Sequence, residues 1–280
     1  MTGRIIKGIG GFYSVMTQAG IITVKARGKF RIEDITPMIG DMVETDGETM
    51  LKILPRKNSL IRPPIANVDC MALTLSASKP APDLLLADKL LYQATFAGID
   101  AFICVNKADL GDGGFAEQFI NAGCDIIMAS AMTGQGIEEL KARLHGCTIF
   151  AGQSGVGKTS LINAILPESE LETGEISERI GRGRHTTRHS ELIPLNGGVV
   201  VDTPGFSVFD SSLFDAPPDR WYKEIDDKRQ GCQFSGCEHR TEPGCAVKEA
   251  VEQGLIHKER YSRYLRLLDE HKESRRKIYD

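Results

Sequence analysis

The chain has 280 residues, 41% of them hydrophobic and 26% charged, which is typical of a globular protein rather than a disordered or fibrous one. This length favours two or three domains. The net charge of -4 argues against a uniformly basic nucleic-acid binder, and the lack of an apolar run of about 18 residues argues against a membrane helix.

The N-terminal sequence and the cysteine count indicate a cytoplasmic protein, and its segments differ in net charge. The N-terminal MTGRIIKGIGGFY has no apolar core of signal-peptide length, and seven cysteines without an export signal do not suggest a disulfide framework. Residues 1–60 and residues 228–280 each carry a net charge of +3, whereas residues 61–227 carry -10. The basic ends could dock on phosphate or could be ordinary solvated surface.

Residues 1–60 are predicted to form a small β-barrel. Short segments rich in Val, Ile and Thr are separated by Gly, Asp and Pro, a pattern typical of short strands joined by tight turns. Pro55 and the segment IRPPIAN then indicate a linker or domain edge. The expected strands are GGFYSVMT, GIITVKARGKF, DMVETDG and ETMLKILPR.

From residue 68 onward, predicted strands alternate with predicted helices, which indicates a parallel or mixed sheet covered on both faces. The first helix has Asp83 as its candidate N-cap and ends at Gly98. The expected strands are VDCMALTLSAS, AFICV, CDIIMASA, CTIFAG, HSELIPL and GGVVV. The expected helices are PDLLLADKLLYQATFAG, AEQFINAG, GIEELKARLHG and TSLINAIL, followed near the C-terminus by the charged KERYSRYLRLLDEHKESRRK.

The stretch GQSGVGKTS, residues 152–160, fits the phosphate-binding loop pattern G-x-x-x-x-G-K-[ST]. It lies between a predicted apolar strand and a predicted helix, the context that such a loop requires. Its glycines let backbone N–H groups turn inward around phosphate, and the following helix adds its positive N-terminal end. Lys158 is expected to reach the outer phosphates and Thr159 to bind magnesium.

Other motifs that follow predicted strands indicate guanine. NKAD, residues 106–109, offers Asp109 to the two guanine donors that adenine lacks, while Asn106 can bridge to the phosphate loop. Ser130-Ala131 offers a backbone N–H for guanine O6.

Two further motifs are predicted to contact magnesium and the γ-phosphate. DTPG, residues 202–205, offers Asp202 to magnesium through water and the Gly205 N–H to the γ-phosphate. In GRGRHTTRH, Thr186 and Thr187 can reach magnesium when triphosphate is bound.

The predicted functional residues fall into three sets. Catalytic roles are expected for Lys158, Thr187 and His185, and magnesium is expected at Thr159, Thr187 and Asp202. Nucleotide is expected to contact Asn106, Lys107, Asp109, Ser130, Ala131, Gly152, Gln153, Ser154, Gly155, Val156, Gly157, Lys158, Thr159, Ser160, Asp202 and Gly205.

The order of these motifs indicates a circular permutation. An ordinary GTPase has the phosphate loop first, then the switch threonine, DxxG, NKxD and SA. In this chain NKAD and SA precede the phosphate loop, and the threonine and DTPG follow it. The expected join is GIEELKARLHGCTIF. In it, the helix that is last in an ordinary GTPase leads directly into the strand before the phosphate loop.

The segment CQFSGCEHRTEPGC predicts a metal site. Three thiolates and one imidazole suit a closed tetrahedral structural zinc. The alternative is a set of reduced cysteines packed in a small core. The predicted ligands are Cys232, Cys237, His239 and Cys245. The other cysteines lie in or next to apolar strand segments and are expected to be core residues; they are Cys70, Cys104, Cys124 and Cys147.

Over nearly its whole length the sequence resembles the RsgA family, the ribosome-small-subunit-dependent GTPases. The shared motifs are PMIGDMV, IRPPIANVD, NKAD, SGVGKTSLIN, GRGRHTT, DTPGF and the zinc segment; Cys70 is a local departure. The resemblance implies an α/β fold with an OB-fold barrel at 1–60, a circularly permuted P-loop GTPase domain at 61–217, and a zinc-binding, partly helical domain at 218–280. It further implies a role in late maturation of the small ribosomal subunit, binding of its rRNA, and hydrolysis stimulated by that subunit. We expect a cytoplasmic monomer that uses GTP with magnesium and one structural zinc ion.

Three questions stay open at this point. Phe206 stands where many GTPases have a water-orienting Gln, so slow intrinsic turnover is predicted, and the missing group could come from His185 or from the ribosome. The alternatives to a GTPase enzyme are a nucleotide-gated binding module, an ATP-dependent enzyme, and a zinc nucleic-acid module with a degenerate GTPase domain. The basic C-terminal tail could meet RNA or be solvated.

Overall fold

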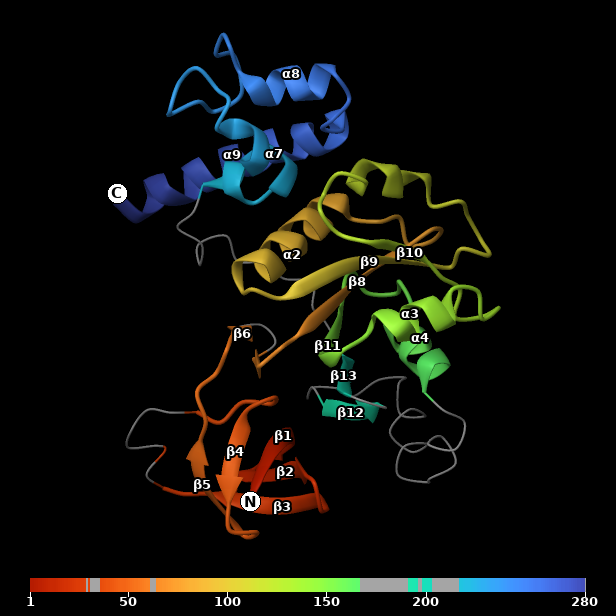
Figure 1. Cartoon of the computed structure of the whole chain (residues 1–280), viewed down its shortest axis with the longest axis vertical. Helices are drawn as coiled ribbons and strands as arrows, with labels where there is room; N and C mark the ends of the chain where they lie inside the picture. Colours follow the sequence, from red (N-terminus) through yellow and green to blue (C-terminus); the bar gives the residue numbers. More distant parts are fainter. Residues whose placement is uncertain are drawn as a thin grey trace.

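The computed structural model describes residues 1–28, 30, 36–60, 64–166, 191–195, 198–202 and 217–279. For residues 191, 202 and 277–279 it describes the backbone alone. No helix within these ranges combines the length and apolar character needed to cross a membrane. Figure 1 shows an N-terminal barrel at one end, a central sheet with helices, and a C-terminal group of helices at the other end.

The N-terminal strands close into a barrel in the order β1-β2-β3-β5-β4, as the sequence predicts. A buried core of Ile5, Val15, Val24, Phe30, Val43 and Met50 fills it. The strands are β1 (Thr2–Ile9), β2 (Phe12–Thr17), β3 (Gly20–Ala26), β4 (Met42–Thr45) and β5 (Thr49–Ile53).

Strand β1 was not expected from the sequence, because its side chains do not alternate cleanly. Its register with β2 shifts between Ile5 and Lys7, as at a β-bulge. The two consecutive isoleucines, Ile5 and Ile6, are therefore both buried. Ile5 fills the barrel, whereas Ile6 joins the core of the central sheet. The bulge thus gives one strand two buried faces.

The segment expected as a linker contains a short two-stranded ladder of β6 (Ser59–Leu60) and β7 (Ile65–Ala66). Leu60, Ile65 and Ala66 are at most 2% exposed, and burial of these apolar side chains explains why this part of the connection is ordered. Of the two alternatives predicted for this segment, an irregular linker is wrong for the β6 and β7 residues, whereas a domain edge stays a prediction.

The central sheet has six strands in the order β10-β9-β8-β11-β13-β12, and β12 alone runs antiparallel to its neighbour. This is the mixed sheet that the sequence predicts. The strands are β8 (Cys70–Ser76), β9 (Asp100–Asn106), β10 (Ile126–Met128), β11 (Gly146–Ala151), β12 (Glu191–Leu195) and β13 (Gly198–Asp202).

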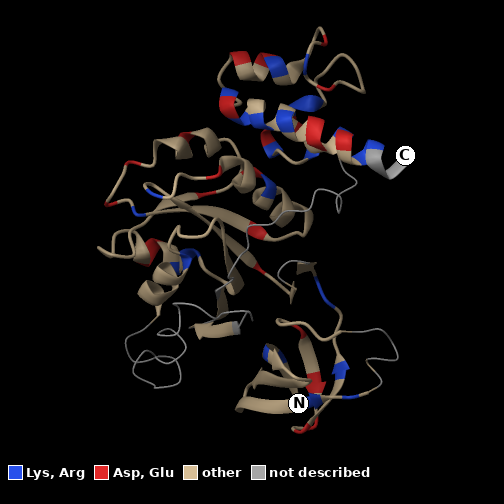
Figure 2. Cartoon of the chain, turned by 180° about the vertical axis from the view of Figure 1, so that it is seen from behind, with Lys and Arg blue, Asp and Glu red and all other residues tan. Residues whose placement is uncertain are grey.

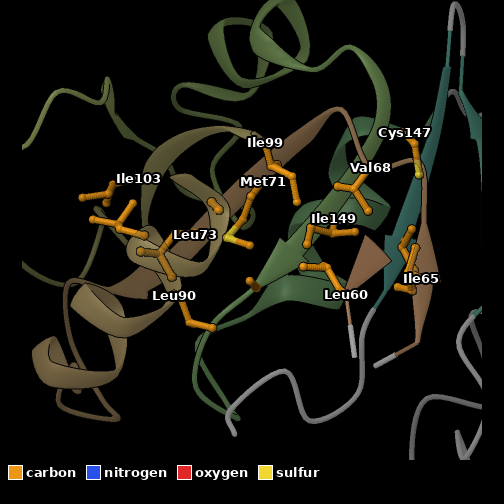
Figure 3. Packing of buried hydrophobic residues seen from close by; sticks show 14 of the residues in the cluster. Leu60, Ile65, Val68, Met71, Leu73, Leu90, Ile99, Ile103, Cys147 and Ile149 are labelled. Carbon is orange, nitrogen blue, oxygen red and sulfur yellow. The ribbon is translucent and has the colours of Figure 1, made fainter. Parts of the chain in front are cut away.

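Alternate side chains of β8 fill the two faces of the sheet. Met71, Leu73 and Leu75 belong to the cluster covered by α2 (Leu84–Phe96), part of which Figure 3 shows. Cys70 and Ala72 belong to the opposite cluster, with side chains of two further helices. These helices are α3 (Ile137–Arg143) and α4 (Lys158–Ile165).

The predicted N-cap of α2 is confirmed, since Asp83 accepts a hydrogen bond of 2.9 Å from the Leu86 N–H. The short helix expected at AEQFINAG is instead the 3-10 helix η1 (Gly114–Phe119), which starts two residues earlier. Its start follows Gly113, whose φ of 63° lies in the left-handed region that glycine adopts without strain.

The C-terminal part packs on α2. Trp221 stacks on Tyr92 of α2 with ring centroids 4.5 Å apart. Both Lys/Arg and Asp/Glu residues lie along the last helix, as Figure 2 shows. The helices are η3 (Pro218–Arg220), α7 (Lys223–Arg229), α8 (Ala246–Glu252) and α9 (Lys258–Tyr279).

A buried charge cluster joins α2 to this part. Asp88 of α2 is fully buried and accepts hydrogen bonds from Arg260 at 2.7 Å, Arg263 at 2.5 Å and the Tyr222 hydroxyl at 3.0 Å. Arg260 also pairs with Glu224 of α7. We call these five residues the α2 clamp.

Candidate nucleotide and metal sites

The predicted nucleotide motifs that the structure describes meet at one edge of the central sheet. Strands β9, β10, β11 and β13 are parallel, so the segments that follow them emerge on the same side. NKAD begins at Asn106, the last residue of β9. Ser130-Ala131 follows β10, and the phosphate loop joins β11 to α4. Helix α3 ends at Arg143 and β11 begins at Gly146, which is the short join expected for the permuted chain.

The phosphate loop depends on glycine at two close approaches. A Cβ at Gly152 would lie 2.2 Å from the Thr74 carbonyl oxygen, and one at Gly157 would lie 2.3 Å from Nδ2 of Asn106. Both glycines have positive φ, 133° and 95°. Any larger residue would therefore strain the backbone and push the loop away from the neighbouring strand ends.

Lys158 is the first residue of α4 and is 7% exposed. Its ammonium turns back into the loop and donates hydrogen bonds to the carbonyl oxygens of Gly152 at 2.8 Å and Gln153 at 3.0 Å. The structure thus places the ammonium of Lys158 within the phosphate loop.

Asn106 bridges the loops, as the sequence predicts. Its Nδ2 donates to the Val156 carbonyl at 2.9 Å, and its Oδ1 accepts from the Ala131 N–H at 3.2 Å. One buried side chain therefore fixes the phosphate loop relative to the loop after β10. The Ala131 N–H, which we expected to face guanine O6, is engaged with Asn106 in this structure.

Lys107 and Asp109 flank the position expected for the base. Lys107 has a φ of 64° and donates to the Gly155 carbonyl at 2.8 Å and the Lys79 carbonyl at 2.6 Å. Asp109 is exposed, and its Oδ1 accepts from the buried Ser130 hydroxyl at 2.6 Å. The Ser130 hydroxyl therefore orients the carboxylate that is predicted to read guanine.

Sequence reasoning missed the contribution of the segment that follows β8. Besides the Lys79 carbonyl, Gln153 Oε1 of the phosphate loop accepts from the Asp83 N–H, the N-cap of α2, at 3.2 Å. The available signal was topological, because β8 ends at the same edge of the sheet as the motif-bearing strands.

Of the residues predicted in the two switch segments, the structure describes Asp202 alone. Asp202 ends β13, with its backbone in register with Phe150 of β11. The remaining predicted residues of the two switch segments lie outside the described residues; they are His185, Thr186, Thr187, Gly205 and Phe206.

The four predicted metal ligands converge in the C-terminal part. Their donor atoms all lie within 4.8 Å of one another. His239 Nδ1 is 3.5 Å from Cys232 Sγ and 3.4 Å from Cys245 Sγ, and these two sulfurs are 3.9 Å apart. Around a tetrahedral zinc, the separations would be about 3.5 Å for sulfur to nitrogen and about 3.8 Å for sulfur to sulfur. The cluster could therefore hold a zinc ion.

The turn that carries His239 is held by surrounding hydrogen bonds. His239 has a φ of 62°, and its carbonyl accepts from the Tyr261 hydroxyl of α9. The Glu242 carboxylate accepts from the N–H groups of Glu238, Arg240 and Thr241, and these bonds lower the pKa of Glu242 to about 2. The ligand turn is thus fixed from both sides.

All four other cysteines were expected in the core; three of them are core residues, and the fourth packs against the core. Cys70, Cys104 and Cys147 are fully buried, and Cys124 is partly buried. Burial raises the thiol pKa of Cys104 to about 12 and that of the others to about 11. These thiols are therefore protonated at neutral pH when no metal is bound.

The fold and this edge of the sheet define a circularly permuted P-loop GTPase. The family description "RsgA GTPase" matches residues 53–212, and "RsgA N-terminal domain" matches residues 2–50. The chain therefore belongs to the RsgA GTPase family and is a GTP hydrolase.

Individual relatives agree along almost the whole chain. The protein is 44% identical to the small ribosomal subunit biogenesis GTPase RsgA of Caldanaerobacter subterraneus, over 99% of this chain and 98% of the relative. It is 45% identical to the same-named protein of Ruminiclostridium cellulolyticum, over 95% and 92%. Two solved structures at 34% identity are similar. They are YloQ, a circularly permuted GTPase, with a TM-score of 0.78 over 98% of this chain and 95% of that one, and YjeQ from Thermotoga maritima, with 0.80 over 96% and 98%.

Proposed function

We propose that this GTPase acts in late maturation of the small ribosomal subunit and that the subunit stimulates its GTP hydrolysis. The names of relatives that are 41–45% identical over nearly the full chain support the process. The observation that carries the nucleotide assignment is the Asn106 bridge between the phosphate loop and the loop after β10, with Asp109 oriented beside it.

We assign the nucleotide contacts to Asn106, Lys107, Asp109, Ser130, Ala131, residues 152–160, Asp202 and Gly205. Lys158 exchanges its two carbonyl partners for phosphate oxygens, and Gly152 and Gly157 let the backbone N–H groups approach the same phosphates. Thr159, Asp202 and Thr187 would hold magnesium, which would neutralise charge on the phosphates.

The group that orients the attacking water is supplied by His185 or by the ribosome, because Phe206 has no hydrogen-bonding side chain. A hydrophobic residue at this position makes intrinsic turnover slow. The test of His185 is the His185→Ala variant, for which unchanged subunit-stimulated turnover would rule out the catalytic role.

Three domains follow from this assignment: an OB-fold barrel at 1–60, the GTPase domain at 61–217 and a zinc domain at 218–280. One zinc ion at Cys232, Cys237, His239 and Cys245 has a structural role, since four protein ligands leave no position for a reacting water.

The barrel carries rRNA contacts. This is supported by Phe12, which is 53% exposed, and by the Lys25 ammonium, which lies 5.8 Å from the centroid of the Phe12 ring. The protein acts as a cytoplasmic monomer.

Asp109→Asn is expected to lower GTP affinity about 10- to 100-fold, because it replaces a charged acceptor of two guanine N–H groups by a neutral amide. Affinity for ATP should change little, so the preference for GTP over ATP should shrink. The measurement is competition between the two nucleotides for the purified protein.

Asp112→Asn is the matched control, because Asp112 is an exposed carboxylate in the same loop that accepts only from the Gly114 N–H among the described contacts. An unchanged preference in Asp109→Asn, or an equal loss in both variants, would contradict the assignment of Asp109 as the guanine-reading residue.

A further inference from the structure

Three potential metal ligands lie at the opposite end of the central sheet from the nucleotide motifs. Cys70 begins β8, Asp100 begins β9, and His145 directly precedes β11. Cys70 and Asp100 are register partners on adjacent strands. One donor atom from each of the three residues lies within 4.8 Å of the other two, and His145 Nε2 is 3.7 Å from Asp100 Oδ2.

We propose that Cys70, Asp100 and His145 form a second metal site, for a thiophilic divalent cation of the zinc class. Thiolate, imidazole and carboxylate are the donors that such cations take, and three protein ligands leave a fourth position for water. On binding, the Cys70 thiol releases its proton to solvent and the sulfur donates to the metal. This site is independent of the four-ligand cluster in the C-terminal part.

The exposure of the three residues gives the ion a way in. The Cys70 side chain is fully buried, whereas those of His145 and Asp100 are 51% and 43% exposed. A cation approaching from solvent would meet the exposed imidazole and carboxylate first and the sulfur behind them. Donor atoms around a tetrahedral ion are about 3.3–3.8 Å apart, so the donor atoms need to approach one another by at most about 1.5 Å.

The charges around the site balance a divalent ion. Arg143 donates to both oxygens of Asp100, at 2.6 and 2.9 Å, and to Asp125 at 2.9 Å. Two carboxylates and one thiolate against one guanidinium give a net charge of -2 once the thiol has lost its proton. A carboxylate has lone pairs for both a guanidinium and a metal. Arg143 orients Asp100, but its positive charge makes this site weaker than the four-ligand cluster.

The site would tie together segments that are distant in sequence. His145 lies in the join between α3 and β11, the connection expected from the permutation, and Thr148 at the start of β11 donates to the His145 carbonyl at 3.0 Å. Metal bound here links this join to the first residues of β8 and β9. It therefore stabilises the folded GTPase domain by mass action.

Cobalt titration of the zinc-loaded full-length protein tests the proposal, because a thiolate bound to Co²⁺ gives a charge-transfer absorption band. Zinc content is measured after each titration, so that exchange at the four-ligand cluster is recognised and such samples are excluded. Wild-type protein is expected to show the band and to saturate at one Co²⁺ per chain. The band should vanish in Cys70→Ala, and His145→Ala should bind about tenfold or more weakly.

Cys147→Ala is the matched control, since Cys147 is also fully buried at this end of the sheet but belongs to the opposite core cluster (Figure 3). It should titrate like the wild type. The exposed position of His145 makes its variant safe for folding, which is checked by thermal unfolding. No band in the wild type at a large excess of Co²⁺, or an unchanged band in Cys70→Ala, would overturn the proposal.

Discussion

Replacing Asp88 by alanine is expected to lower the free energy of unfolding by about 3–5 kcal/mol, because it leaves buried positive charge without its partner. The side chains of Asp88 and Arg260 are 0% and 4% exposed, and Arg263 and the Tyr222 hydroxyl share the same carboxylate. Glu224 still pairs with Arg260 but does not contact Arg263 in the described hydrogen bonds. The loss should appear in urea unfolding and as faster proteolysis of residues 217–279.

The control for Asp88→Ala is Asp227→Ala, which removes an exposed pair with Lys223 whose side chains are 56% and 58% exposed. That change should cost less than about 1 kcal/mol. If the two variants unfold at the same urea concentration, the α2 clamp does not hold the C-terminal part on the GTPase domain.

Replacing Cys245 by serine is expected to remove one zinc ion per chain relative to the wild type and to unfold the C-terminal part. Structural zinc supplies about 10–16 kcal/mol in zinc-finger peptides, as much as or more than the whole stability of an ordinary domain. Cys245 is 3% exposed, and its sulfur lies 3.9 Å from Cys232 Sγ and 3.4 Å from His239 Nδ1. Zinc analysis and limited proteolysis measure both effects.

Cys124→Ala serves as the control, because Cys124 is partly buried beside the core of the central sheet and belongs to neither candidate metal cluster. It should keep its zinc and its protease resistance. Wild-type zinc content in Cys245→Ser, or zinc loss without any change in proteolysis, would contradict a structural role for the metal.

The sequence signals for the nucleotide site are local. The glycine spacing of the phosphate loop, the NKAD tetrapeptide and the Cys/His spacing are each contained in fewer than about 15 residues, and the strand and helix pattern places them at strand ends. The permutation followed from the order of those motifs. The contacts of Asn106 with Val156 and Ala131 agree with the expected bridge.

The sequence failed where the cause lies in distant contacts. The bulge in β1 disrupts the alternation that indicates a strand. Leu60 and Ile65 are ordered by burial in the core of the sheet, which no turn signal reveals. Asp88 was visible only as an acid within an apolar helix, and its partners come from the far end of the chain.

The most direct test of the central claim is GTP turnover by the purified protein alone, with small ribosomal subunits and with large subunits. We expect small subunits, but not large subunits, to raise the GTP turnover of the protein by about tenfold or more, as when a partner supplies a missing catalytic group. Lys158→Ala is the inactive control. Equal stimulation by both subunits, or no stimulation while GTP still binds, would contradict a GTPase triggered by the small subunit.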